Sequence, residues 1–201
     1  MPNIILASKS RVRLEILKKN HINCNAEPAN VDEETIKQSL RKDGATPELI
    51  SKNLAELKAN KISQVKKDYI VLGADSVIDL NGQIISKPKD RKEALDILKK
   101  LNGKKHHLIS SACISKGGLM IWNHSEKATL TMKNFSEDEL KLYLSKISDD
   151  NLYSYNVYQI EGEGKNLFSE IKGDKDTIMG LPIKKIKEYL SIYEGKWKNI
   201  L

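Results

Sequence analysis

The chain has 201 residues, of which 39% are hydrophobic and 30% charged, a composition typical of a folded globular protein and not of a disordered one. Its longest apolar runs are far too short to cross a bilayer, which argues against a membrane protein. The formal net charge of +7 suggests an anionic partner, but lysines alternate with acids and aromatic residues make up only 5%, so a nucleic-acid-binding face is disfavoured.

The start of the chain and its cysteines predict a compartment. The first residues lead directly into a strand pattern, so no signal peptide is expected. Cys24 and Cys113 lie in apolar segments without a metal-ligating neighbour at the usual spacing, and we expect both to be reduced core residues. Together these features predict a soluble, cytoplasmic protein.

The first half of the sequence alternates between strand and helix patterns. Strands are expected at residues 3–7, 22–28 and 70–80, and helices at 10–20, 35–42 and 47–66. Pro47 suits the first turn of the long helix, and Asp43-Gly44 closes the helix before it. This order predicts strands and helices that succeed one another along the chain.

Two hairpins interrupt the alternation in the second half. Asn81-Gly82 predicts a tight turn into residues 83–86, and Gly117-Gly118 joins strands at 107–116 and 119–133. Helices are expected from Asp90 to 101, from Ser136 and from 181, with a polar, tyrosine-rich segment up to about 163 and a strand at 167–171. Because the hairpins make the sheet mixed and no repeat or linker interrupts it, we expect an α/β fold: a mixed central sheet flanked by helices, in one domain over residues 1–201.

The first candidate site is the turn between the first strand and the first helix. Free backbone N–H groups and the positive end of the helix dipole point to one spot there. The hydroxyls of Ser8 and Ser10 and the cation of Arg13 would suit phosphate oxygens at that spot. The segment lacks the glycines of a Walker loop, and the alternative is that Ser10 simply caps the helix. The local sequence by itself favours that alternative.

The second candidate is Asp75, within the most apolar strand of the chain. A carboxylate in such a strand is costly unless it meets a cation, a metal or hydrogen-bond donors. Ligands also gather at strand ends in open α/β sheets. The alternative is an edge-strand aspartate turned to water, but both flanks are apolar, which favours a functional role.

Other charged groups are weaker candidates when taken singly. Glu33 lies in an acidic cluster that could hold a metal, although acids before a helix ordinarily interact with its dipole. Lys58 lies in mid-helix and Lys87 follows a hairpin, and both positions are usually only solvated. His106 and His107 are better explained as residues at a strand start than as metal ligands.

The order of these short motifs along the chain resembles that of the Maf family of nucleoside triphosphate pyrophosphatases. The resemblance covers nearly the whole length and includes Leu6-Ala7-Ser8-Lys9-Ser10 with Arg13, Val31-Asp32-Glu33, Leu54-Ala55 with Lys58-Ala59, Gly73-Ala74-Asp75, Lys87-Pro88, Gly103 with His106, Tyr158 to Gly162, and Gly180-Leu181-Pro182. It implies an inosine-triphosphatase-like mixed-sheet architecture, a cytoplasmic location, dependence on Mg²⁺ or Mn²⁺, and a possible homodimer. The implied reaction converts a nucleoside triphosphate to the monophosphate and pyrophosphate.

The resemblance also implies roles for individual residues. Asp75 falls on the catalytic aspartate, which would bind the metal together with Glu33. The polar positions expected to bind substrate are Ser8, Ser10, Arg13, Lys58 and Lys87. The chain departs from the family pattern at Arg11, where proline is usual, at Ser86, where glycine is usual, and at Val12 and Ser76, positions associated with substrate choice.

Glu161 leads to a prediction about the base. Relatives have glutamine or glutamate at its position, and glutamine is associated with pyrimidine substrates. A carboxylate only accepts hydrogen bonds, so it suits the N1–H and exocyclic amine of guanine better than the carbonyls of uracil or thymine. We therefore expect a preference for guanine-type triphosphates, modified or not. The alternative is that Glu161 only pairs with a surface lysine.

Two other functions remain open at this stage. One is a regulatory protein that senses nucleotides without hydrolysing them, and acts on cell division. The other is a basic nucleic-acid-binding domain. The presence of Asp75, Glu33, Lys58 and Lys87 favours the enzyme over the sensor, and the scattered charge disfavours nucleic acid.

Overall fold

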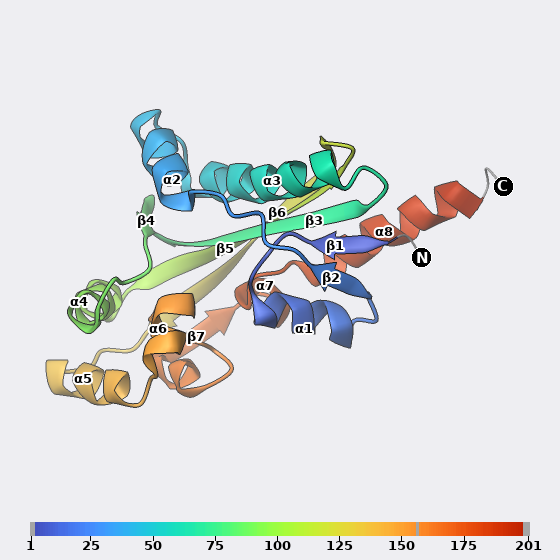
Figure 1. Ribbon diagram of the computed structural model, residues 1–201. Helices are drawn as coiled ribbons and strands as arrows, with labels where there is room; N and C mark the ends of the chain where they lie inside the picture. Colours follow the sequence, from blue (N-terminus) through green and yellow to red (C-terminus); the bar gives the residue numbers. More distant parts are fainter. Residues whose placement is uncertain (1–2, 156, 199–201) are drawn as a thin grey trace. The chain divides into compact units, whose positions relative to one another are not determined.

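A seven-stranded mixed sheet with helices around it is the central feature of the computed structural model, which describes residues 3–155 and 157–198 (Figure 1). The strands run in the order β2-β1-β3-β5-β6-β7, and β4 pairs with β3. They are β1 (Ile4–Leu6), β2 (Cys24–Ala26), β3 (Ile70–Leu80), β4 (Gln83–Ile85), β5 (Lys105–Lys116), β6 (Leu119–Met132) and β7 (Phe168–Lys172). β1 is parallel to β2 and β3, whereas the β3–β4 and β6–β7 pairs are antiparallel, so the expected mixed sheet is confirmed.

The helices follow the expected order with three additions, α6, η1 and α7. They are α1 (Arg11–Lys19), α2 (Glu33–Lys42), α3 (Pro47–Val65), α4 (Arg91–Leu101), α5 (Glu137–Ser145), α6 (Asp149–Tyr155), the 3₁₀ helix η1 (Glu163–Leu167), α7 (Lys175–Ile178) and α8 (Ile183–Lys198). Within the described residues no helix is long and apolar enough to cross a membrane.

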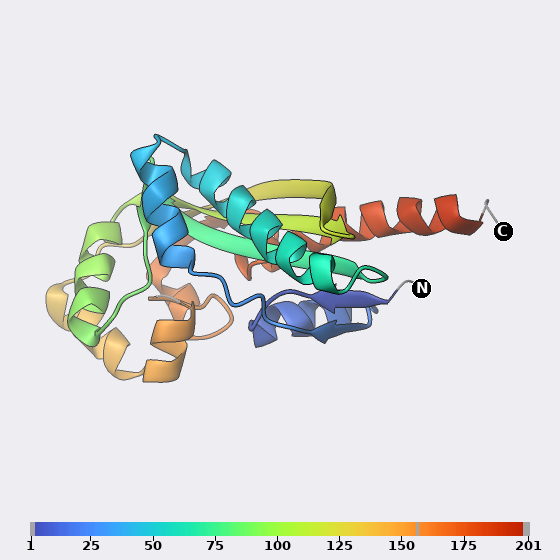
Figure 2. The ribbon, with the colours of Figure 1, turned by 45° about the horizontal axis from the view of Figure 1, so that its top comes forward.

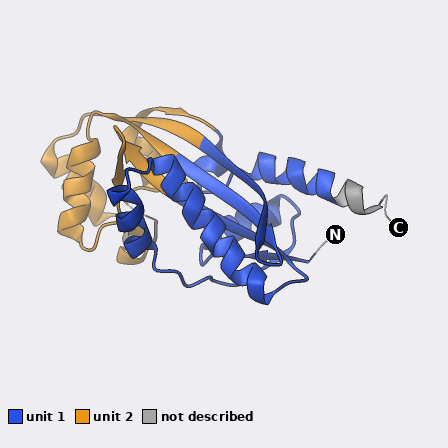
Figure 3. Cartoon of the chain, turned by 90° about the horizontal axis from the view of Figure 1, so that it is seen from above, with its two compact units in different colours: residues 1–76, 109–126, 174–201 blue, residues 77–108, 127–173 orange. Residues whose placement is uncertain are grey.

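The chain divides into two compact units (Figure 3). Unit 1 comprises residues 1–76, 109–126 and 174–201, and unit 2 comprises residues 77–108 and 127–173. The division falls within β3, β5 and β6, so each of these strands contributes to both units. The expectation of a single domain stays a prediction.

The core of unit 1 has two layers, which follow from the alternation of side chains along a strand. Leu6, Leu72 and Ala74 pack with residues of α1 and α8 on one face. Val71 on β3 packs with Ala55 of α3 on the other face. Figures 1 and 2 show α1 and α3 on opposite sides of β1 and β3. Neighbouring residues of β3 therefore point to different helical layers.

Unit 2 contains the β4 hairpin, α4, α5 and the end of the sheet. Asn81 and Gly82 have positive φ angles of 53° and 83°, as the predicted two-residue turn requires. Ser136 and Glu139 form the predicted capping box at the start of α5. His106 Nε2 lies 2.9 Å from the Tyr158 hydroxyl, so the histidine that opens β5 is a buried partner in the core of unit 2.

The structure explains why two of the added helices, α6 and α7, were not expected from the sequence. The tyrosine-rich segment contains α6, whose first residue Asp149 forms an ion pair with Arg91 at 2.7 Å. α7 is a single short helix capped by Asp174, whose carboxylate accepts from the backbone N–H groups of Asp176 and Thr177. α6 depends on a partner distant in sequence, and α7 is too short to show a helical periodicity.

The cysteines differ in burial. Cys113 is buried and its pKa is raised by burial to about 11, whereas Cys24 is only half-buried. Both cysteines are free thiols. The sequence predicts both as core residues, and only Cys113 is fully buried.

Candidate active site

The turn after β1 is organised by its two serines. Ser10 is the N-cap of α1, and its hydroxyl accepts from the backbone N–H of Arg13 at 3.3 Å. Ser8 Oγ accepts from the backbone N–H of Ser10 at 3.2 Å and from Arg13 Nη1 at 3.3 Å. With both lone pairs of Ser8 occupied, its O–H proton is what remains to offer a ligand, and an anion suits it. The capping role of Ser10 is thus confirmed, and phosphate binding by the turn stays a prediction.

Arg13 is held by the protein through most of its guanidinium. It donates to the backbone carbonyls of Gly180 (Nε, 2.9 Å) and Ala74 (Nη1, 3.1 Å). It also donates to Ser8 Oγ (Nη1, 3.3 Å) and Ser76 Oγ (Nη2, 3.1 Å). At least four of its five N–H groups therefore serve protein acceptors. This geometry connects the turn, the middle of β3 and the segment before α8.

The electrostatics of Arg13 place it near the acidic residues. Burial lowers the pKa of its guanidinium, and the negative charges of Asp75 and Glu33 oppose that shift. Arg13 thus lies close enough to both carboxylates to interact with them, while its hydrogen bonds come to β3 from the α1 layer.

Asp75, Lys58 and Glu33 form a charged group on the α3 face of β3. Lys58 Nζ lies 2.8 Å from Asp75 Oδ1 and 2.7 Å from Glu33 Oε1. Asp75 is 4% exposed and the Lys58 side chain 9%, whereas the Glu33 side chain is 41% exposed and also pairs with Lys37. Asp75 Oδ2 is buried and has no hydrogen-bond partner among the described residues. One carboxylate oxygen of Asp75 is therefore fixed by a cation and the other is unpaired.

Gly73 explains how α3 brings Lys58 so close to β3. A Cβ atom at Gly73 would lie 2.7 Å from the backbone N of Ala59 and closer still to the carbonyl oxygen of Ala55. Ala55 and Ala59 are fully buried, so the helix packs directly against the strand backbone. Asp75 lies two residues after Gly73 and points to the same layer. The small residues of the sequence thus set the distance from Lys58 to Asp75.

The residues present fit a divalent cation in part. Within the described residues no group of three or more His, Cys, Asp or Glu side chains could hold a metal by itself. Mg²⁺, however, is commonly held by one or two carboxylates together with substrate phosphates and water. The unpaired Oδ2 of Asp75 and the partly exposed carboxylate of Glu33 match such a donor set.

The remaining predicted site residues lie in different places. Val12 is half-buried on α1 and packs against the core of unit 1, and Ser76 binds Arg13. Lys87, in the loop after β4, and Glu161, in the loop before η1, are both exposed and belong to unit 2. Unit 1 therefore brings together seven of the predicted positions, Ser8, Ser10, Arg13, Glu33, Lys58, Asp75 and Ser76, whereas the participation of Lys87 and Glu161 in the same site stays a prediction.

Two buried serines near Asp75 were missed in the sequence. Ser51 Oγ donates to the backbone carbonyl of Asp75 at 3.1 Å, and Ser110 Oγ lies 2.8 Å from Ser76 Oγ. Ser51 and Lys58 are seven residues apart on one face of α3, a spacing that could have identified Ser51. Ser110 offered only the weaker signal of a polar residue within an apolar strand.

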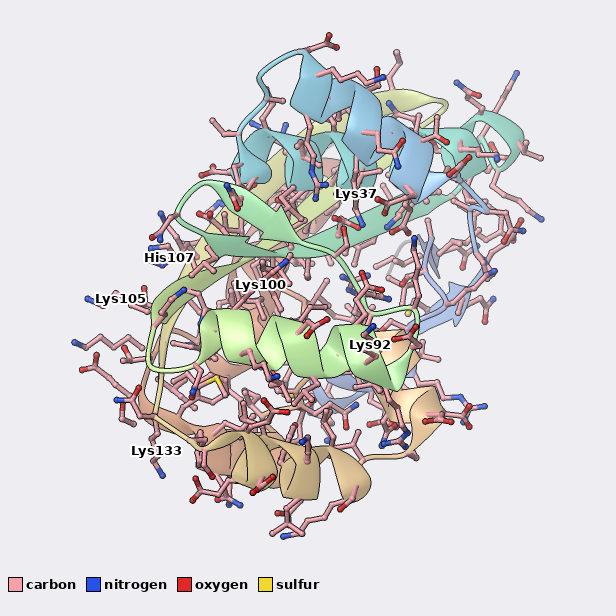
Figure 4. All side chains as sticks on the ribbon, turned by 90° about the vertical axis from the view of Figure 1, so that its left-hand side faces the viewer. Lys37, Lys92, Lys100, Lys105, His107 and Lys133 are labelled. Carbon is pink, nitrogen blue, oxygen red and sulfur yellow. The ribbon has the colours of Figure 1, made fainter. Side chains whose placement is uncertain are left out.

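Unit 2 exposes several lysines that do not form a single basic surface. Figure 4 shows Lys92 and Lys100 on α4, Lys105 at the start of β5 and Lys133 after β6. Acidic residues are interspersed among such lysines: Glu137, for example, pairs with Lys99 at 2.6 Å. This mixture is typical of a solvated surface. The expectation that nucleic acid is not the partner stays a prediction.

Comparisons with known proteins point to one family. A family model described as Maf-like protein matches residues 3–192. A nucleoside triphosphate pyrophosphatase of Pelagibacter ubique (strain HTCC1062) is 69% identical over 189 residues, which cover 94% of this chain and 97% of the relative. A 7-methyl-GTP pyrophosphatase of Rhizobium etli is 36% identical over 182 residues, covering 90% of this chain and 92% of the relative.

Solved structures give a more distant likeness. A Ham1 protein from Coxiella burnetii matches with a TM-score of 0.45 and 13% identity, over 66% of this chain and 73% of that one. A nucleoside-triphosphatase, or dITP/XTP pyrophosphatase, from Mycobacterium abscessus matches with a TM-score of 0.44 and 12% identity, over 99% and 98%. The sequence matches, and not these structures, carry the family relationship.

Proposed function

Because the chain belongs to the Maf family, we propose that it is a metal-dependent nucleoside triphosphate pyrophosphatase with a preference for guanine-type bases. The reaction is the hydrolysis of a triphosphate to the nucleoside monophosphate and pyrophosphate. The observation that carries the proposal is the buried Asp75, with one oxygen fixed by Lys58 and the other unpaired.

The Asp75 carboxylate is suited to activating water. Lys58 holds Oδ1 at 2.8 Å, and burial makes the unpaired Oδ2 a strong hydrogen-bond acceptor. In the proposed step Oδ2 accepts a proton from water while the water oxygen bonds to the α-phosphorus. The bond from that phosphorus to the bridging oxygen breaks, and pyrophosphate leaves.

Mg²⁺ or Mn²⁺, held by Glu33 and Asp75, would supply positive charge against the phosphate oxygens. The same Oδ2 of Asp75 suits either role, proton acceptor or metal ligand. The two roles differ in the pH profile: a general base gives an acidic limb in kcat/KM that persists at saturating metal.

Several donors in unit 1 suit the phosphates of the substrate. Ser8 retains its O–H proton, and Lys58 retains one of its three N–H groups after binding two carboxylates. Ser10 holds the N-terminus of α1 in place, where backbone N–H groups favour an anion. Lys87 of unit 2 is proposed as a further phosphate ligand, and Arg13 contributes charge from its anchored position.

Glu161 supports the preference for guanine. Its exposed carboxylate can accept from both N1–H and the exocyclic amine of guanine, an arrangement that uracil and thymine do not offer. Relatives at 36% identity bear the name 7-methyl-GTP pyrophosphatase, which supports a guanine-type substrate for this chain. A cytoplasmic location and a homodimer are further proposals from the family.

The test is incubation of the full chain with GTP, 7-methyl-GTP, ATP, CTP, UTP and dTTP, each with Mg²⁺, Mn²⁺ or EDTA. We expect equimolar pyrophosphate and nucleoside monophosphate, fastest with the guanine nucleotides, and no turnover with EDTA. Orthophosphate and a nucleoside diphosphate as primary products would contradict the proposed cleavage between the α- and β-phosphates. Binding without any product would instead favour the nucleotide-sensing alternative.

A further inference from the structure

A series of hydrogen bonds through two serine hydroxyls, those of the half-buried Ser76 and the buried Ser110, connects Arg13 to α7 within unit 1. Arg13 Nη2 donates to Ser76 Oγ at 3.1 Å, and Ser76 Oγ lies 2.8 Å from Ser110 Oγ. Ser110 Oγ in turn donates to the backbone carbonyl of Thr177 at 2.7 Å. Ser110 and Thr177 are both fully buried.

The direction of each of these three hydrogen bonds is fixed. A serine hydroxyl has one proton, and that of Ser110 goes to the Thr177 carbonyl, which can only accept. The hydroxyl of Ser76 must then donate to Ser110 Oγ, and it accepts from Arg13. Ser76 therefore has no proton left for a substrate oxygen.

We infer that Ser110 is a positioning residue of the active site, which holds Ser76 as an acceptor for Arg13 and thereby fixes the guanidinium beside the part of β3 that carries Asp75. The inference rests on the proposed function for its kinetic consequence only. Because the hydroxyl proton of Ser76 goes to Ser110, the influence of Ser76 on catalysis runs through its bond to Arg13.

The consequence for Arg13 follows from its other contacts. The same guanidinium donates to Ser8 Oγ, in the proposed phosphate-binding turn, and to the carbonyl of Ala74, the residue before Asp75. If Ser76 no longer holds Nη2 of Arg13, the guanidinium can rotate, and the hydrogen bonds of Nη1 and Nε change with it. Because a planar guanidinium depends on geometry for its hydrogen bonds, small rotations weaken several at once.

The test compares two neighbouring serines of β5. Ser110→Ala removes the relay, whereas Ser111→Ala is the matched control: Ser111 is equally buried, but its hydroxyl pairs with Ser125 Oγ at 2.8 Å. We expect Ser110→Ala to lower kcat about tenfold with KM changed less than twofold, as for the loss of one buried hydrogen bond. Ser111→Ala should keep wild-type kinetics.

A second variant and a spectroscopic readout separate positioning from general destabilisation. Ser76→Ala should lower kcat to the same extent, and the double variant Ser76→Ala/Ser110→Ala should be no worse than either single change, because the relay is serial. In ¹H–¹⁵N spectra, the Nε proton of Arg13 should exchange slowly with water in the wild type and in Ser111→Ala, and rapidly in Ser110→Ala.

An unchanged Arg13 Nε–H signal in Ser110→Ala would overturn the inference, whatever the activity. Additive losses in the double variant, or equal losses from Ser110→Ala and Ser111→Ala, would overturn it as well. Absence of pyrophosphate release by the wild type with every triphosphate would overturn the proposed function instead, and the spectra would still decide the role of Ser110.

Discussion

Substituting Gly73 by alanine tests whether helix–strand contact sets the geometry of the catalytic pair. The φ angle of Gly73 is not among the positive values of the described glycines, so alanine fits its backbone conformation. The added methyl would nevertheless lie 2.7 Å from the backbone N of Ala59, and nearer to the Ala55 carbonyl. Both obstacles are backbone atoms of a buried helix, which cannot rotate away as a side chain can.

The magnitude follows from the displacement that the methyl requires. Ordinary carbon contacts lie at roughly 3.5–4.0 Å, so α3 must move outward by about 1 Å. Such overpacking typically costs about 1–3 kcal/mol of unfolding free energy. The same shift would lengthen the 2.8 Å contact between Lys58 Nζ and Asp75 Oδ1, and a misplacement of ~1 Å at a catalytic group can cost about a hundredfold in rate.

The assay combines urea unfolding with steady-state pyrophosphate release. We expect Gly73→Ala to unfold at lower urea with an unchanged m-value, and to lose kcat far more than its folded fraction explains. Gly162→Ala is the stability control, because a Cβ at Gly162 has no atom within 4 Å. Wild-type stability and kcat in Gly73→Ala would refute the reasoning that close packing on β3 fixes Lys58.

Three further predictions concern single groups. Asp75→Asn should lose on the order of a hundredfold or more in kcat, since the amide neither accepts a proton nor binds a metal as the carboxylate does, while its circular dichroism stays native; near-normal turnover would rule out Asp75 as the catalytic group. Glu161→Gln should raise the rates for UTP and dTTP relative to GTP, and unchanged relative rates would mean that Glu161 does not read the base. Burial lowers the pKa of His106 from 6.5 to about 4, so the unfolded chain binds more protons between these values and stability should fall by on the order of 3 kcal/mol as the pH drops from 6.5 to 4. Urea titrations at stepped pH measure this loss; it should be absent in His106→Gln, and an equal loss in that variant would show that other groups cause it.

Local signals in the sequence were sufficient for most elements of the fold. Ser10, Asp90 and Ser136 each cap the helix that they were expected to begin, because a capping side chain acts on backbone groups two or three residues away. The two hairpin turns formed where consecutive residues tolerate positive φ. Such interactions involve near neighbours, and a sequence reveals them directly.

Interactions between distant segments were less accessible. The Asp75 carboxylate could be recognised as a group in need of a partner, but Lys58 was expected, from the resemblance to a family, only to bind substrate, and the ion pair between them was not predicted. The contacts of Arg13 with Gly180 and of Ser110 with Thr177 join residues 167 and 67 positions apart. No periodicity or cap reports such a contact, because it depends on which elements the sheet brings together.

The middle of β3 shows why one short segment can serve two layers of the protein. Side chains alternate along a strand, so Asp75 points to α3 and Lys58, whereas Ser76 points to the layer that holds α1 and Arg13. The carbonyl of Ala74, which lies in the plane of the sheet, accepts from Arg13 as well. A shift of the strand by one residue would turn Asp75 away from Lys58 and Ser76 away from Arg13. The register of β3 is thus specified twice, by a buried ion pair on one face and by an arginine fork on the other. Both must form together, and this links the stability of the middle of β3 to the geometry that the proposed reaction requires.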